Sequence, residues 1–145
     1  MAKKTQITID QNDSGWTETD LSSAVLGVFA EYTVPAGMAL EFKPSDIIAL
    51  YLEDNATTAA ELNGSIPVQV VIEEPFSIGT KLLAKGEYTR FKTYDDITKT
   101  FKIGQRMAAP SNSVVKLKAN PNAGIASLDA SDCRFTLTCS LISPN

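Results

Sequence analysis

The sequence predicts an all-β protein: a two-sheet antiparallel sandwich, with the jelly roll as first choice and at most one or two short helices. Three observations support this prediction. Short segments in which apolar and polar residues alternate recur along the chain, and this is the period of a strand with one buried face. Pro, Gly, Asn and Ser separate the segments, and no longer repeat is present. The segments number roughly eight to ten, which is enough for two packed sheets.

The stretch 29–52 shows the alternation most clearly. Its turn at 35–37 reads Pro-Ala-Gly, in which Pro restricts φ and Gly accepts the positive φ that such turns often need. Residues 38–43 then alternate, with Met, Leu and Phe on one face and Ala, Glu and Lys on the other. After a break at 43–45, residues 47–52 are apolar on both faces, which predicts a central strand covered on each side.

Further strands are expected, in chain order, at 6–10, 66–72, 86–93, 97–103, 113–119 and 133–142. Pro67, near the beginning of its strand, predicts either an edge strand or the first position of a strand. The last strand carries Cys133 and Cys139 on its apolar face. Six residues along a strand span about 20 Å, which is too far for a disulfide, so we expect two buried free thiols.

The length of 145 residues predicts a single sandwich domain over 1–145, in which residues 1–5 are a candidate flexible N-terminal arm. Hydrophobic residues make up 43% and charged residues 21%, so the core needs neither disulfides nor metal. No apolar run approaches the roughly 18–20 residues of a membrane span, and the first residues are polar. We therefore expect no membrane contact and a protein made in a cytoplasm, or assembled into a particle there.

The net charge of −4 conceals an uneven distribution along the chain. Residues 5–80 contain twelve acidic side chains and a single basic one, Lys43, whereas residues 81–118 contain nine basic and three acidic ones. Two interpretations stay open at this point. The charges are ordinary solvated strand faces that the sandwich interleaves, or they form separate acidic and basic surfaces suited to docking.

The residues for catalysis are missing. Histidine is absent, which removes the commonest general base, the usual Ser and Cys protease arrangements and a common metal ligand. The obvious carboxylate doublets are Glu73-Glu74 and Asp95-Asp96, and neighbours in a strand point to opposite faces. No Gly-rich phosphate loop occurs. We therefore expect no enzyme, no catalytic residue, no cofactor and no metal site.

A nucleic-acid surface is one alternative, because basic and aromatic side chains adjoin in the sequence. They are Tyr88, Arg90, Phe91, Lys92 and Tyr94, a combination that can stack bases and bind phosphates. The isoelectric point near 4.8 argues against it, since an acidic protein repels a polyanion. Core aromatics beside solvated lysines are the simpler explanation, and we expect no nucleic-acid partner.

Four segments resemble parts of phage and virus structural proteins. They are EYTVPAGMALEF at 31–42, ALYL at 49–52, VQVVIEEP at 68–75 and VVKLKA at 114–119. In particular, the chain is similar to small β-sandwich capsid decoration proteins, also called cement proteins. The likeness is scattered over the chain, so it assigns no functional residue.

The resemblance implies a non-enzymatic virion protein on the outer surface of an icosahedral phage capsid. Such a protein is assembled in the host cytoplasm, is often a trimer, and stabilises contacts between subunits of the major capsid protein without a small-molecule substrate. Basic side chains on exposed faces are the candidate partner contacts: Lys3, Lys4, Arg90, Lys92, Lys99 and Lys102. A phage tail or spike module and a carbohydrate-binding sandwich are the alternatives, although Trp16 is the sole tryptophan and no aromatic ladder is visible.

Overall fold

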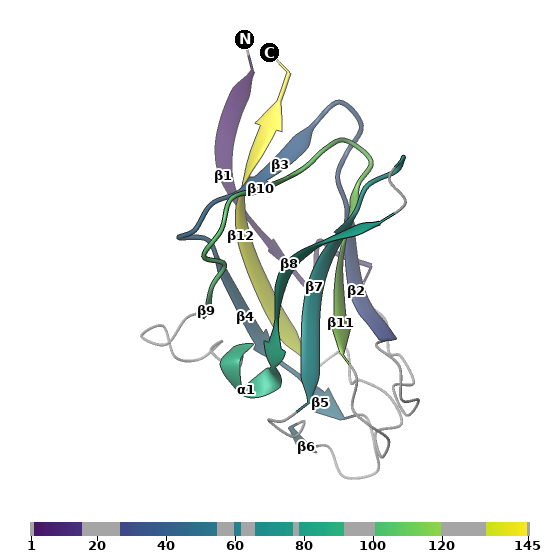
Figure 1. Ribbon diagram of the computed structural model, residues 1–145, viewed down its shortest axis with the longest axis vertical. Helices are drawn as coiled ribbons and strands as arrows, with labels where there is room; N and C mark the ends of the chain where they lie inside the picture. Colours follow the sequence, from purple (N-terminus) through teal and green to yellow (C-terminus); the bar gives the residue numbers. More distant parts are fainter. Residues whose placement is uncertain are drawn as a thin grey trace.

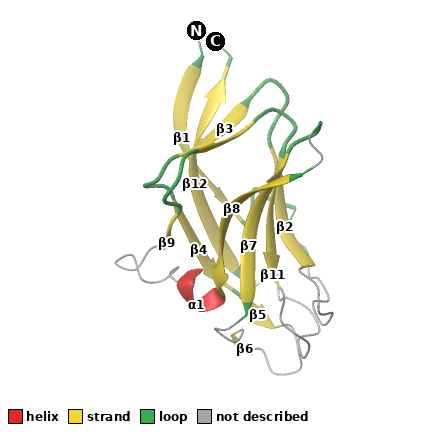
Figure 2. Cartoon of the chain, viewed as in Figure 1, coloured by secondary structure: helices red, strands yellow, loops and turns green. Residues whose placement is uncertain are grey.

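The computed structural model describes residues 2–15, 27–54, 60–61, 66–76, 79–91, 101–119 and 133–144. Its elements in these ranges are β1 (Lys3–Asp10), β2 (Gly27–Thr33), β3 (Ala39–Phe42), β4 (Ile47–Tyr51), β5 (Glu53–Asp54), β6 (Ala60–Glu61), β7 (Pro67–Glu73), β8 (Thr80–Glu87), α1 (Tyr88–Phe91), β9 (Phe101–Lys102), β10 (Met107–Ala109), β11 (Val114–Ala119) and β12 (Arg134–Ser143). Strands dominate the described part of the chain, and α1 is a single short turn of helix (Figure 2). The all-β prediction is confirmed.

Two antiparallel sheets face each other (Figure 1). The first sheet contains β1, β12, β3, β4, β9 and β10, and the second has the order β2-β11-β7-β8. In the first sheet β1 pairs with one side of β12, while β4 and β3 pair with β12 one after the other. β9 and β10 in turn pair with β4 and β3. Thus β3 with β4, and β10 with β9, each form one interrupted strand.

The strand order is that of a jelly roll. β5 and β6 form a separate two-stranded sheet. Counting each interrupted pair as one strand gives eight positions in the two main sheets, with the order 1-8-3-6 in the first and 2-7-4-5 in the second. This interleaving of early and late strands is what two Greek keys produce in a double-sheet jelly roll. The first choice made from the sequence is therefore confirmed.

The two interruptions lie side by side in the first sheet. One comprises residues 43–46, between β3 and β4, and the other comprises residues 103–106, between β9 and β10. Backbone hydrogen bonds join them, from the Ile103 amide to the Asp46 carbonyl at 2.8 Å and from the Gly104 amide to the Pro44 carbonyl at 3.1 Å. The sheet therefore keeps its connection across the break instead of ending there.

The core fills the space between the sheets. β12 alternates from Arg134 to Cys139, with Phe135, Leu137 and Cys139 buried, and β11 buries Val115 and Leu117 in the same way. These inward residues are the ones that the alternation predicts. Burying a large apolar side chain contributes roughly 1.5–3 kcal/mol, so the two alternating faces supply much of the driving force for folding.

Several local predictions from the sequence are confirmed. Gly37 has φ 79°, and the Met38 amide donates to the Pro35 carbonyl at 3.1 Å, which closes the predicted turn. Pro67 is the first residue of β7, which is the second of the two predicted placements, and β7 lies in the interior of the second sheet. The middle of β4 is buried, as expected for a covered strand.

The prediction of a strand over 86–93 is wrong. β8 occupies 80–87 and the chain then turns into α1, in which Tyr88 and Phe91 are fully buried. Residues three apart lie on one face of a helical turn, so both rings reach the core together. The Tyr88 hydroxyl accepts a hydrogen bond from the Leu52 amide at 2.8 Å. The strand expected at 97–103 is described only as β9, because 92–100 lie outside the described residues.

Residues 3–5, within the candidate arm, belong to β1. Lys3, Lys4 and Thr5 lie opposite Ser143, Ile142 and Leu141 of β12. This pairing carries the first sheet to the end of the molecule where both termini emerge (Figure 1). No helix in the described ranges has the length and apolar character needed to cross a membrane.

Both cysteines are free and buried, as predicted. Burial raises the pKa of the Cys139 thiol to about 12, and the nearby Asp46 carboxylate contributes in the same direction. Because the thiolate is the reactive form, we expect iodoacetamide to modify neither cysteine of the folded protein over hours at neutral pH. Mass spectrometry should show two alkylated residues only after denaturation. Rapid modification of the folded chain would contradict the buried placement.

Candidate interaction surface

Two turns are tied together at one end of the sandwich. The Asn112 amide donates to the Val34 carbonyl at 3.0 Å, and the Val34 amide donates to the Ser113 carbonyl at 2.8 Å. The Ser111 hydroxyl donates to the Met38 carbonyl. These bonds join the β2–β3 turn to the β10–β11 turn. We call the surface made by residues 34–38, 74–76 and 110–113 the loop end.

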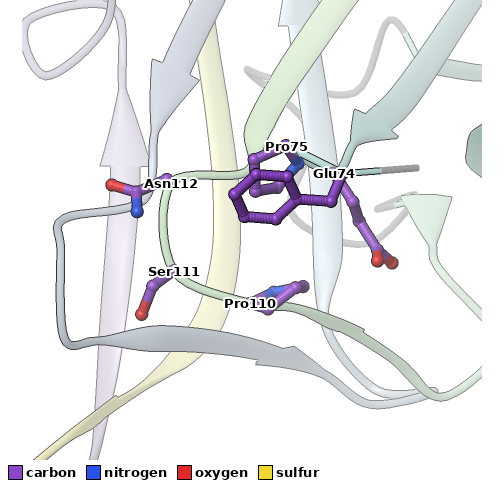
Figure 3. Close-up of a pocket in the computed structure, with 6 residues that line it drawn as sticks. Glu74, Pro75, Pro110, Ser111 and Asn112 are labelled. Atoms are coloured by element: carbon purple, nitrogen blue, oxygen red, sulfur yellow. The ribbon is translucent and has the colours of Figure 1, made fainter. Parts of the chain in front are cut away.

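A pocket of about 460 Å³ opens in the loop end between the β10–β11 turn and the segment that follows β7 (Figure 3). It is lined by Glu74, Pro75, Phe76, Pro110, Ser111 and Asn112. Phe76 is 99% exposed, whereas the other phenylalanines for which burial is described are buried or half-buried. A fully exposed aromatic ring beside an apolar pocket is a typical feature of a protein contact surface.

Polar contacts hold the strands around this pocket. Lys81 of β8 forms an ion pair with Glu74 and donates to the Ala108 carbonyl of β10 at 3.2 Å. Lys81 therefore links an edge strand of one sheet to an edge strand of the other. These contacts join Glu74, which lines the pocket, to β8 and β10.

The structure divides the predicted partner contacts into two groups. Lys3 and Lys4 are exposed on β1 near the termini, while Arg90 on α1 and Lys102 on β9 are exposed toward the opposite end of the first sheet (Figure 1). The Arg90 guanidinium carbon lies 5.6 Å from the centre of the Phe101 ring. Phe101 directly precedes Lys102 in the sequence. Lys92 and Lys99 lie outside the described residues. The basic residues therefore do not form one surface, and their contact role stays a prediction.

The acidic and basic halves of the sequence interleave in space. Lys116 pairs with Glu73 at 2.7 Å in the second sheet, and Lys81 pairs with Glu74 beside it. Lys116 and Glu73 are distant in sequence and meet because a jelly roll places early and late strands side by side. In the described residues these pairs favour the interpretation of solvated, interleaved strand faces over separate charged surfaces.

A buried carboxylate organises the interruption between β3 and β4. Asp46 is 2% exposed and accepts hydrogen bonds from the Lys43 amide at 2.9 Å, the Thr138 hydroxyl at 3.0 Å and the Gln6 side-chain amide at 3.2 Å. The Lys43 ammonium lies 3.4 Å away. Burial alone would raise the pKa of Asp46, but these hydrogen bonds and the Lys43 charge together lower it below its usual value. Asp46 is thus a structural anion rather than a poised acid.

Two of the three aromatic residues considered for stacking bases, Tyr88 and Phe91, are not available for that role. Tyr88 and Phe91 are fully buried, and their rings belong to the core. Lys92 and Tyr94 lie outside the described residues. In the ranges that the structure describes, no group of three or more His, Cys, Asp or Glu side chains is arranged to hold a metal ion.

Sequence reasoning missed both Phe76 and Asp46. The only signal for Phe76 was an aromatic residue directly after Glu-Glu-Pro, where the alternation has already ended. Asp46 follows the predicted break at 43–45, and nothing in the local sequence indicates that Thr138 would come to lie against it.

Comparisons with solved structures agree with the jelly-roll fold described above. No family model matches the sequence, and no curated protein matches it either. Among solved structures, VP17, a capsid protein of bacteriophage P23-77, matches with a TM-score of 0.68 over 99% of this chain and 98% of the other, at 7% identity. The chain has the fold of a phage capsid protein. The complex of VP16 and VP17, the two major capsid proteins of that phage, matches with a TM-score of 0.69 over 96% of this chain and 98% of the other, also at 7% identity.

Proposed function

We propose that this chain is a structural protein of a virion, a capsid protein that acts through contacts with other protein subunits and not through catalysis. The observation that carries the proposal is the fold match over nearly the whole length of both chains. A match of that extent leaves no additional domain to supply a different activity within the matched region. Fold alone does not fix function, so the surface features must bear on the proposal too.

The loop end supports the proposal. Phe76 and the pocket beside it form an apolar contact with a polar rim that includes Glu74 and Ser111. Burying one exposed aromatic ring at a subunit contact contributes roughly 1.5–3 kcal/mol, and a shell multiplies such a contact by its copy number. The natural partner of this surface is another capsid subunit.

Two roles within a capsid follow from different observations. The solved neighbours are a capsid protein and a complex of major capsid proteins, which favours a shell-forming subunit. The sequence resemblance at 31–42 and 68–75 favours the second candidate, a decoration protein on the capsid exterior that stabilises contacts between major capsid subunits. In that second role the trimeric state stays a prediction, as do the contacts of the six basic residues named from the sequence: Lys3, Lys4, Arg90, Lys92, Lys99 and Lys102.

The experiment is to purify particles by density gradient from cells that carry the gene and to identify the proteins in the DNA-containing fraction. We expect the chain to be present in many copies per particle. Deleting the gene distinguishes the roles: loss of all shells indicates a shell-forming subunit, whereas intact shells that break at a lower temperature indicate a decoration protein. Absence of the chain from the particles would end the virion proposal.

A substitution tests the loop end separately. Phe76→Ser is expected to reduce incorporation into particles about tenfold or more, because it removes an apolar contact without touching the core. Leu82→Ser is the control, since Leu82 is also an exposed large apolar residue and does not line the pocket. Normal incorporation of the Phe76→Ser variant would show that the subunit contact lies elsewhere on the surface. It would not contradict the virion role.

A further inference from the structure

Strand β1 is a long open edge. Among the described residues it pairs only with β12, on one side, and this pairing covers all eight of its residues. Lys3–Gln6 and Thr8 are exposed. An edge strand of this length presents a row of backbone amides and carbonyls that another strand can pair with.

The other sheet edges are irregular or covered. β8 carries a bulge at Leu83, and its Leu82 and Leu83 carbonyls accept hydrogen bonds from the Gln105 side chain at 3.2 and 2.8 Å. β2 carries a bulge at Phe29, and the edge formed by β10 and β9 is interrupted at 103–106. Bulges, breaks and covering side chains all discourage strand addition. Within the described residues, β1 is thus the edge that runs longest without a bulge or a break.

We infer that β1 pairs antiparallel with β1 of a second copy of this chain, about a two-fold axis at Ile7. The inference does not rest on the proposed virion role. It joins the two first sheets into one continuous sheet across the dimer. Such a contact is isologous, because each copy contributes the same strand.

Charge selects this register. A two-fold axis normal to the sheet keeps each face on its own side, so even-numbered residues of one copy must oppose even-numbered residues of the other. With Ile7 on the axis, Lys4 lies opposite Asp10 of the second copy, and Gln6 lies opposite Thr8. Lys4 already binds Glu41 of its own chain at 2.7 Å, so its ammonium would lie between two carboxylates. Opposite charges directly across a ladder are favourable, and because of the two-fold symmetry the Lys4–Asp10 pair occurs twice in the dimer.

The inner face also fits this register. Ile7 is half-buried and packs on the edge of the core, and it would meet Ile7 of the second copy on the axis. Thr5 would lie opposite Ile9. The central residues Thr5–Ile9 read Thr-Gln-Ile-Thr-Ile, which are uncharged and rich in β-branched side chains that suit a paired strand. The lysines at the start of β1 meanwhile disfavour neighbours that offer no carboxylate.

Sedimentation of the isolated chain at about 50 mM salt tests the contact, since charge pairs at a surface weaken as salt rises. We expect a reversible dimer that dissociates at higher salt. Lys4→Glu should raise the dimer dissociation constant about tenfold or more by opposing two pairs of like charges, and Lys4→Glu with Asp10→Lys should restore it. Lys3→Glu is the matched control: it makes the same change in charge one residue away, on the other face, and should leave the dimer intact. Circular dichroism confirms that each variant is folded.

Cross-linking tests the register. An equimolar mixture of Gln6→Cys and Thr8→Cys chains should form a disulfide-linked dimer under mild oxidation, whereas each variant alone should not. Efficient cross-linking of the Gln6→Cys chain alone would place Gln6 on the axis and overturn the register. A strict monomer at all concentrations, or a trimer, would overturn the contact itself. None of these results depends on whether the chain is found in particles.

Discussion

Replacing Tyr88 with alanine is expected to lower the free energy of unfolding by about 4–6 kcal/mol. Tyr88 has the largest fully buried side chain among the described residues, so its removal leaves a large cavity in the core. The change also takes the hydrogen-bond acceptor from the buried Leu52 amide, which Tyr88 holds at 2.8 Å. A domain of this kind is stable by about 5–15 kcal/mol, so the variant should be close to unfolding at 37 °C.

Two milder variants separate the two contributions. Tyr88→Phe keeps the ring and removes only the hydroxyl, so we expect a loss of about 1–3 kcal/mol from the unpaired Leu52 amide. Tyr32→Phe removes a hydroxyl from a half-buried tyrosine of β2 and should change stability by less than about 0.5 kcal/mol. Urea denaturation followed by circular dichroism measures all three. Equal effects of Tyr88→Phe and Tyr32→Phe would show that the bond to Leu52 contributes nothing.

Replacing Asp46 with alanine should cost about 2–4 kcal/mol of stability, because the Lys43 amide and the Thr138 hydroxyl would lose a buried charged acceptor. Asp46→Asn is expected to cost less, since an amide oxygen can still accept from Lys43. The asparagine variant also isolates the effect of charge. Urea denaturation again provides the measurement.

The stabilisation by Asp46 depends on pH with a definite sign. Its pKa in the folded protein lies below the value of about 3.9 for an unfolded chain, so the carboxylate stabilises the fold fully above that pH. The stabilisation is lost as the pH falls through the lower, folded value. The difference in stability between the wild type and Asp46→Asn should therefore shrink on acidification below about pH 4.

Other carboxylates do not obscure this test. The hydrogen bond from Lys4, aided by the Lys4 charge, lowers the pKa of Glu41, but Glu41 is present in both proteins and cancels in the difference. A difference that stays constant down to about pH 2 would contradict the charged state of Asp46.

The sequence predicted the fold where alternation is uninterrupted. β11 keeps the two-residue period from end to end and β12 keeps it as far as Cys139, while the Pro-Ala-Gly turn needs only local geometry at Gly37. β8 was missed over most of its length because the bulge at Leu83 shifts the period in the middle of the strand. The helical turn α1 was read as a strand because the burial of Tyr88 depends on a distant partner, Leu52.

The interaction surface was less predictable than the fold. Phe76 stands out only once its exposure is known, since the sequence around it does not separate a core aromatic from a surface one. The charge pattern left two interpretations open for a related reason: Lys116 and Glu73 become neighbours through topology, and composition along the chain does not encode that pairing. The position of β1 at an open sheet edge likewise could not be predicted without knowing the strand order.

The adjoining interruptions at 43–46 and 103–106 give the first sheet a crease. On one side of this line lie β3, β10 and the outer part of β1 with the end of β12, and on the other side lie β4 and β9 (Figure 1). Only β12 and β1 cross the crease as unbroken strands. We expect bending of the outer part against the body to be concentrated at this crease, where the Asp46 carboxylate joins residues 43–46 to β12 and β1 through Thr138 and Gln6.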